Sequence, residues 1–383
     1  MNLSQLMNAK NLQSRKGRFL QCTLRKNNSQ KITFLYLLAI LSSGLFYSYA
    51  TTWLIVEDLA TVFLILFLSS IIDMFVFFDV TFFKKVSKVS SRNLTLISIV
   101  FLIATLIFSN SNSLLFLVIL YVFCTLSFSF HLLSFEQELL RTKNNIRSGL
   151  INITLLRNFS KIIGFAIGAW IYKMQLQEYI FILLISFLFF LFINIQPEVE
   201  QSQKKISIKA LKGKVYIFVL SLLGTTAVFW IPLFVAELTE KKLLNLSSIV
   251  FTLPGIVSVA YLNLISREKF DISLMAKNKL HILFLISFGI LNFIEAYLII
   301  RIILFSFIVA LGISISVEVR SRFMNVNNHI DTKVTLQTYN LISAVSLLIF
   351  TLLSIYFNEF PFYLLGLNVV ASLIILTHRK EFI

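Results

Sequence analysis

The stretch RSGLINITLLRNFSKIIGFAIGAW, residues 147–170, is apolar over most of its length but carries two cations and two glycines. Read as an α-helix, it places its polar and small residues on one face, at steps of three and four: Thr154, Arg157, Lys161, Gly164 and Gly168. Glycines four residues apart allow close helix packing within a membrane. A charged face has to lie against protein or water, because a charge that faces lipid is costly. The stretch therefore predicts a transmembrane helix inside a larger bundle.

Apolar stretches of this length recur along almost the whole chain. Of its 383 residues, 57% are hydrophobic and only 14% are charged, where soluble domains have about a quarter charged. A helix that crosses a bilayer needs about 20 apolar residues. We therefore predict an all-α integral membrane protein with twelve spans, at residues 32–56, 59–80, 94–109, 114–134, 149–172, 178–196, 214–236, 247–266, 278–295, 298–317, 334–357 and 360–377.

The basic residues predict the orientation. Of the 34 lysines and arginines, 28 fall in the two termini, the linker and the loops on one side of the expected membrane. The opposite loops carry only Lys173, Lys241, Lys242 and Arg301, and the fifth span holds the other two. Cytoplasmic loops are enriched in Lys and Arg, so both termini are expected in the cytoplasm. The net charge of +16 then faces anionic lipid and requires no nucleic acid.

The twelve spans divide into two halves of six. The first spans of the two halves begin 182 positions apart, at 32 and 214, and so do EQELLRTKNN at Glu136 and EVRSRFMNVNN at Glu318. We therefore expect a basic cytoplasmic tail at 1–31, one half at 32–196, a cytoplasmic linker at 197–213, the second half at 214–377 and a cytoplasmic C-terminus at 378–383.

Two six-helix halves joined by a basic linker are typical of secondary transporters. After its tail, the chain resembles the major facilitator superfamily. Residues 147–170 are similar to the family's helix five and the loop before it, and the resemblance implies helix packing at Gly164 and Gly168. Residues 75–93 resemble the loop after helix two, keeping Asp79 but not the glycines of the motif. Gly164 is followed by Phe165, where drug antiporters of the family have proline.

Two cations and one acid within the spans are the sharpest site candidates. Arg157 lies roughly 10 Å and Lys161 roughly 16 Å from the cytoplasmic end of the fifth span. Each is a candidate for binding an anionic substrate or pairing with a buried acid; a structural ion pair or a snorkelling cation is the alternative. Asp73, at a similar depth in the second span, is a candidate for proton coupling or for a structural role in helix packing.

Three further residues are candidates for substrate contact, namely Tyr47, His131 and Trp230. The resemblance places their helices, the first, fourth and seventh, along a central cavity. Aromatic residues and a solvated histidine are also ordinary features of membrane helices, so both interpretations stay open.

Mixed charges on the cytoplasmic side predict a gate. We expect Asp79, Glu136, Arg141, Glu318 and Arg322 to form ion pairs there, in the loops after the second, fourth and tenth spans. The alternative is that these loops are simply solvated.

Motifs for other chemistries are missing from the sequence. There is no phosphate-binding G-x-x-x-x-G-K-[ST] loop and no zinc-type Cys/His cluster, and HLLSFE at 131–136 only loosely resembles the His-x4-acid pattern of acyltransferases. We therefore expect that the protein is not an enzyme and that it binds no metal and no cofactor. The sequence predicts a monomeric secondary active transporter of the plasma membrane, which exports a small organic compound or peptide in exchange for protons by alternating access. The alternatives are uptake of an anionic metabolite and a non-transporting sensor or immunity protein.

Overall fold

The computed structural model describes residues 30–53, 146–174, 177–194, 214–266, 272–326, 345–357 and 359–378, with scattered positions between 55 and 139. Their regular structure is helical throughout. The helices are Gln30–Trp53, α5 (Ile146–Lys173), α6 (Gln177–Asn194), α7 (Lys214–Glu240), the 3-10 helix η2 (Leu244–Leu246), α8 (Ser247–Ser266), α9 (Leu274–Phe293), α10 (Leu298–Val326), Val345–Tyr356 and α12 (Phe360–Thr377). The predicted linker 197–213 and almost all of the second to fourth spans lie outside these residues.

Six helices of the described part are long and apolar enough to cross a membrane. They are Gln30–Trp53, Ile146–Lys173, Leu244–Ser266, Leu274–Phe293, Leu298–Met324 and Phe360–Thr377. The predicted spans 247–266 and 360–377 coincide with α8 and α12. Apolar helices of this length satisfy their own backbone hydrogen bonds, which is what a bilayer requires of a spanning segment.

The surface of α9 shows the polarity of a membrane helix. Its exposed face carries large apolar side chains, including Leu283, Ile286, Ile290 and Phe293. Its buried face carries polar ones, namely Lys277, Asn278, His281 and Asn292. Polar side chains turn inward and apolar ones outward where the surroundings are less polar than the protein interior. The outer surface of α9 therefore faces lipid.

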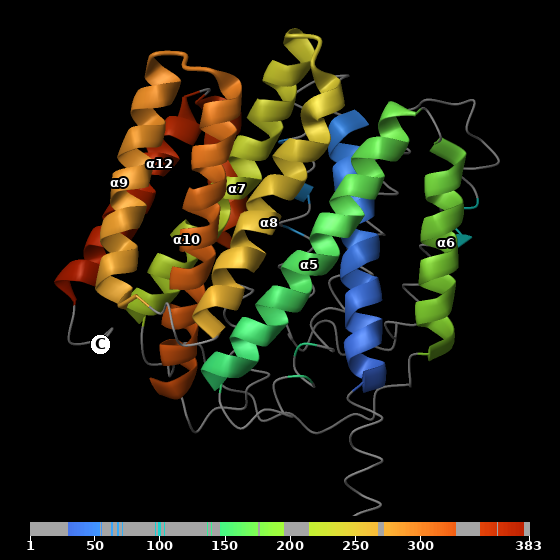
Figure 1. Ribbon diagram of the computed structural model, residues 1–383, viewed down its shortest axis with the longest axis horizontal. Coiled ribbons are helices and arrows are strands. Elements are labelled where there is room, and N and C mark those ends of the chain that lie inside the picture. Colours follow the sequence, from blue (N-terminus) through green and yellow to red (C-terminus); the bar gives the residue numbers. More distant parts are fainter. Residues whose placement is uncertain are drawn as a thin grey trace, which may run out of the picture.

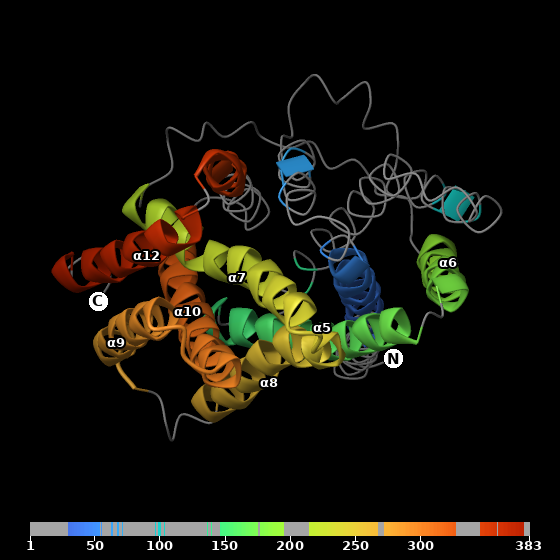
Figure 2. The ribbon, with the colours of Figure 1, turned by 90° about the horizontal axis from the view of Figure 1, so that it is seen from above.

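The helices form two groups side by side, one from each predicted half (Figures 1 and 2). Helix Gln30–Trp53, α5 and α6 lie in one group, and α7, α9, α10 and α12 lie in the other. α5 crosses obliquely and packs along α8, so these two helices form the main described contact between the halves. We refer to the end of the bundle at Gln30 and Val326 as the lower end, as drawn in Figure 1, and to the opposite end as the upper end.

Glycines allow α5 to approach the first helix at backbone distance. A Cβ atom on Gly164 would lie 2.8 Å from the backbone nitrogen of Leu45, and one on Gly168 would overlap the carbonyl oxygen of the same residue. Real Cβ atoms do not approach backbone atoms this closely, so only glycine fits at both positions. The structure thus places the glycine pair of α5 against helix Gln30–Trp53. Small residues at such positions allow membrane helices to pack closely.

The tenth predicted span ended too early. We expected it at 298–317 with Glu318 and Arg322 in a loop, but α10 continues to Val326 and both residues are helical. Arg301, which was counted with the outer loops although it falls within the predicted span, lies on the first turns of α10 and is 8% exposed. Hydropathy underestimated the helix because its charged ends are buried against neighbouring helices, where partners satisfy the charges.

Candidate functional site

A buried carboxylate at Glu136 joins three helices near the lower end. Its side chain is 4% exposed, and its Oε1 accepts a hydrogen bond of 3.0 Å from the Tyr36 hydroxyl of the first helix. The same oxygen pairs with the guanidinium of Arg157 on α5. Its Oε2 lies 3.8 Å from Nη2 of Arg320 on α10. Glu136 therefore sits between one cation from each half of the molecule.

A second ion pair between the halves lies at Glu318 of α10. Its Oε2 accepts a hydrogen bond of 2.9 Å from Nε of Arg147, in the first turn of α5. Its Oε1 lies 3.6 Å from Nη2 of Arg322, four residues further along α10. Arg147 thus links Glu318 to the other half, whereas Arg322 contacts it only within the same helix.

The two glutamates stand 182 residues apart in the sequence, which is the offset between the two predicted halves. Each pairs with an arginine from the opposite half, Glu136 with Arg320 and Glu318 with Arg147. The lower end is therefore joined by two reciprocal ion pairs. The sequence predicted both glutamates as members of a cytoplasmic gate, together with Asp79, Arg141 and Arg322, without assigning their partners; Asp79 and Arg141 lie outside the described residues.

The acid next to Arg157 is Glu136. The sequence offered Asp73 as the buried carboxylate for the cations of α5, because Asp73 lies at a similar depth in its span. Glu136 was assigned instead to a loop, yet it is helical and only 3% exposed as a residue. Asp73 lies outside the described residues, as do Asp79 and His131, so their predicted roles remain predictions.

Lys161 lies one turn above Arg157, near the middle of α5, and its side chain is half-buried. Within the described part of the chain it makes no ion pair and no hydrogen bond. A Cβ atom on Gly44 of the first helix would lie 3.4 Å from the Lys161 Cα and carbonyl oxygen, so the two backbones are close here.

Three aromatic rings meet one turn above Lys161. Tyr47 of the first helix, Phe165 of α5 and Phe251 of α8 have centroids 5.8–6.3 Å apart, and we call them the aromatic trio. Two of the rings belong to one half and the third to the other. Tyr47, a predicted substrate contact, therefore lies at the contact between the halves, close to Lys161.

Trp230 lies in a different environment. Its ring is 3% exposed and packs against Phe234 of its own helix, Phe288 of α9 and Phe362 of α12, with centroids 4.8–6.0 Å apart. All of these rings belong to the second half. The structure therefore does not bring Trp230 together with Lys161 and Tyr47, although the sequence proposed all three as substrate contacts.

An arginine at the upper end ties three helices of the second half together. Arg301 of α10 donates through Nε to the carbonyl oxygen of Ala296 and through Nη1 to Oδ1 of Asn292, each at 3.0 Å. Its Nη2 pairs with Glu237 in the last turn of α7. The sequence does not predict this network; its one signal is a lone arginine at the start of a long apolar run.

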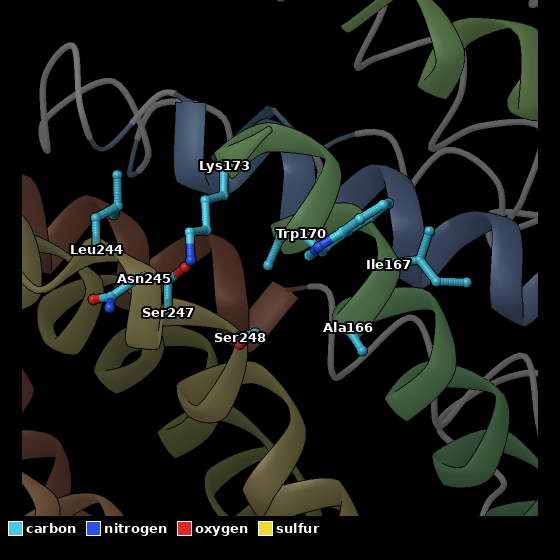
Figure 3. Close-up of a pocket in the computed structure, with 9 residues that line it drawn as sticks. Ala166, Ile167, Trp170, Lys173, Leu244, Asn245, Ser247 and Ser248 are labelled. Carbon is cyan, nitrogen blue, oxygen red and sulfur yellow. The ribbon is translucent and has the colours of Figure 1, made fainter. Parts of the chain in front are cut away.

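The pocket of about 480 Å³ at the upper end lies between α5 and the start of α8 (Figure 3). Trp170, Lys173, Asn245 and Ser247 are among the residues that line it. Trp170 follows Lys161 by nine residues, which turns it to the opposite side of α5. Since Trp170 is 53% exposed, this pocket opens on the outer surface of the bundle, at the upper end of the contact between α5 and α8.

No group of three or more His, Cys, Asp or Glu side chains suited to hold a metal occurs among the residues that the structure describes. The ionisable groups at the contact between the halves are instead cations and single carboxylates. Such groups can bind a charged solute or form ion pairs with one another. Ion pairs between helices can separate and form again when the helices move.

No protein-family model matches this chain, and no curated protein is similar to it in sequence. Solved structures match it over nearly their whole length. The human organic anion transporter MFSD10 is 12% identical with a TM-score of 0.59, and the nucleoside transporter NupG is 14% identical with a TM-score of 0.60. Each alignment covers 90% of this chain and 99% of the other. The chain is therefore an all-helical, multi-pass membrane protein with the fold of major facilitator superfamily transporters.

Proposed function

We propose that the protein is a secondary active transporter that works by alternating access. The observation that carries this proposal is the pair of reciprocal ion pairs, Glu136–Arg320 and Arg147–Glu318, which join the two halves at one end only of the described bundle. Ion pairs of this kind hold one end closed and separate when the halves rock about the centre. The transporter fold supports the same proposal, and the fold's solved examples named above are transporters rather than enzymes.

The complete architecture that accompanies this proposal has twelve spans, with both termini in the cytoplasm and the protein monomeric in the plasma membrane. The halves are residues 32–196 and 214–377, joined by the linker 197–213. In this orientation the lower end faces the cytoplasm, because Arg147, Arg320 and Arg322 lie there and cytoplasmic ends are rich in arginine. Asp79 and Arg141 are proposed as further members of the cytoplasmic gate.

For direction and coupling, we propose export of a small organic compound or peptide in exchange for protons, with Asp73 as the proton carrier. The Phe-rich helices and the few charges within the spans suit an apolar solute. Uptake of an anionic metabolite is the second candidate. The observation that favours it is Lys161, which lies at the middle of α5 without an anionic partner among the described residues.

The experiment is an untargeted comparison of metabolites inside and outside cells that express either the wild type or a gate variant, with and without a protonophore. Arg147→Glu should abolish the redistribution of any transported compound, because it puts two carboxylates together at the gate. The double variant Arg147→Glu/Glu318→Arg should restore it by reversing the pair. The protonophore should abolish it in the wild type.

The matched control is Arg322→Gln, which removes a cation from Glu318 but leaves the contact between the halves. Its transport should stay close to that of the wild type. If no compound distributes differently between wild-type cells and cells with an empty vector, the transporter proposal fails and a sensor becomes the better interpretation.

A further inference from the structure

Lys161 and its neighbour Arg157 differ in how their charges are balanced. Arg157 pairs with Glu136, whereas Lys161 has no carboxylate among the described residues. Lys161 nevertheless lies at the middle of a helix that is long and apolar enough to span the membrane. A cation at that depth is costly unless an anion or water reaches it. A transported anion would supply the negative charge that the described residues do not provide for Lys161.

A second donor lies one turn below Lys161. Asn158 is 8% exposed, and its Nδ2 is fully enclosed with no hydrogen-bond partner among the described residues. Its backbone oxygen lies 3.9 Å from the position of a Cβ atom on Gly255, so this part of α5 faces α8 and the other half. An enclosed donor without an acceptor costs about 1–3 kcal/mol. Three residues of spacing place Asn158 and Lys161 on neighbouring positions of one helix face.

These two groups together determine the charge of the ligand. A lysine ammonium has donors and no acceptor, and the free group of Asn158 is also a donor. The natural complement is an acceptor with several oxygens and a negative charge, such as a carboxylate. A cation would be repelled by Lys161, and a neutral solute would leave the ammonium without a counter-charge.

The aromatic trio determines the shape of the rest of the ligand. Phe165 follows Lys161 by one helical turn, and Phe251 precedes Gly255 by one turn of α8, so the trio lies directly above the two donors. Its rings come from both halves, and its contacts separate when the halves move apart. A flat apolar group of the ligand that inserts between the rings would replace the contacts among the rings with contacts between the rings and the ligand.

We infer that the cargo is an organic anion with a flat, aromatic body, bound by Lys161 and Asn158 through its carboxylate and by Tyr47, Phe165 and Phe251 through its ring. This inference rests on the transport function proposed above. It assigns Arg157 to the gate instead of the ligand site, because Glu136 already holds its guanidinium. It also applies equally to export and to uptake.

The test measures binding to the purified full-length protein in detergent, by the shift in its melting temperature, with six probes that differ in one feature at a time. Indole-3-acetate and benzoate carry the charge and the ring. Indole-3-acetamide and benzamide keep the ring without the charge, tryptamine reverses the charge, and hexanoate keeps the charge without the ring. We expect the two aromatic anions to bind best.

Lys161→Met should weaken the binding of indole-3-acetate by about tenfold or more, which is what loss of a charge-assisted hydrogen bond produces. Lys161→Arg should retain most of it. Phe251→Leu should lower the preference for indole-3-acetate over hexanoate and leave hexanoate binding unchanged. The matched control is Lys173→Met, which removes an exposed cation from the upper end of the same helix and should bind like the wild type.

The outcomes separate this inference from the transport proposal. The inference is overturned if the amides or tryptamine bind as well as the aromatic anions, or if a folded Lys161→Met variant binds indole-3-acetate as the wild type does. It is also overturned if none of the probes binds the wild type. Aromatic anions that bind through Lys161 but do not cross the membrane of proteoliposomes support the site and overturn transport. Selective binding together with Lys161-dependent transport supports both.

Discussion

At the scale of single residues, Arg301 is the clearest case of a charge whose role depends on its surroundings. Its guanidinium donates to Ala296 and Asn292 and pairs with Glu237, and the residue is 8% exposed. Arg301→Met should lower the free energy of unfolding in detergent by about 2 kcal/mol or more, because it leaves Asn292 Oδ1 without its donor and takes the buried cation away from Glu237. Thermal or denaturant unfolding of the purified protein measures this.

The control for that prediction shares the same carboxylate. Lys241 lies 2.6 Å from Oε1 of Glu237, but its side chain is 51% exposed and both residues belong to the same segment. Exposed pairs four residues apart contribute about 0.3–0.5 kcal/mol. Lys241→Gln should therefore change stability little. Equal losses in the two variants would show that burial of Arg301 does not matter.

Glu237 should make this network sensitive to acid. Burial raises the pKa of its carboxyl, but hydrogen bonds and charges from Lys241 and Arg301 outweigh burial and hold the pKa below its usual value. A carboxyl whose pKa is lower in the folded state stabilises the protein above its unfolded pKa, near 4.3, and that stabilisation is lost as the pH falls through the folded pKa.

We therefore expect the difference in stability between the wild type and Glu237→Gln to be constant above about pH 5 and to shrink below about pH 4. Unfolding measured at a series of pH values between 3 and 7 tests this. A difference that stays constant down to pH 3 would contradict the effect of Arg301 on the Glu237 carboxyl.

At the scale of elements, the packing of α5 on the first helix depends on two glycines. Gly164→Ala and Gly168→Ala each place a methyl group against the backbone of residues 41–45, which cannot move away as a flexible side chain could. Overpacking of this kind costs about 1–3 kcal/mol. Both variants should melt at clearly lower temperature than the wild type in the same detergent.

Two glycines in other helices are controls for helix propensity. A Cβ atom on Gly289 of α9 or on Gly366 of α12 would meet no atom of the described residues within 4 Å. Gly289→Ala and Gly366→Ala should therefore melt at the same temperature as the wild type or slightly higher, since alanine favours helix over glycine. If Gly164→Ala behaves like these two, α5 and the first helix are not in backbone contact.

At the scale of the whole molecule, we expect the ion pair between Glu136 and Arg320 to determine how often the lower end opens. Arg320→Gln removes a contact between the halves, so the lower end should open more often. A cysteine at Thr154, three residues before Arg157 on the same face of α5, reports this opening in a background where Cys22 and Cys124 are replaced by serine.

Thr154→Cys should react severalfold faster with a membrane-impermeant maleimide applied from the cytoplasmic side when it is combined with Arg320→Gln. Combination with Arg322→Gln should leave the rate unchanged, because Arg322 contacts Glu318 within α10 only. A rate that Arg320→Gln does not alter would mean that the ion pairs do not hold the lower end closed.

Much of the architecture follows from the sequence because hydropathy acts locally. The predicted spans 247–266 and 360–377 are the observed bounds of α8 and α12, and the fifth span was predicted at 149–172 against an observed 146–173. The prediction was poor where charges occur inside a helix. Glu318 and Arg320 were assigned to a loop, because a hydropathy pattern does not show that a partner on another helix satisfies a charge.

The sequence by itself determined that this is a membrane protein of long apolar helices, and it singled out the polar face of α5 and the glutamates at 136 and 318. Composition and spacing are sufficient for this, because lipid selects apolar side chains whatever their neighbours are. Only the tertiary structure decided which charges meet: that Arg157 binds Glu136, that Arg147 and Arg320 connect the halves, and that Lys161 lies beside an aromatic trio drawn from both. Electrostatic pairing and ring contacts act over a few ångströms, and only folding brings residues of different helices to such distances.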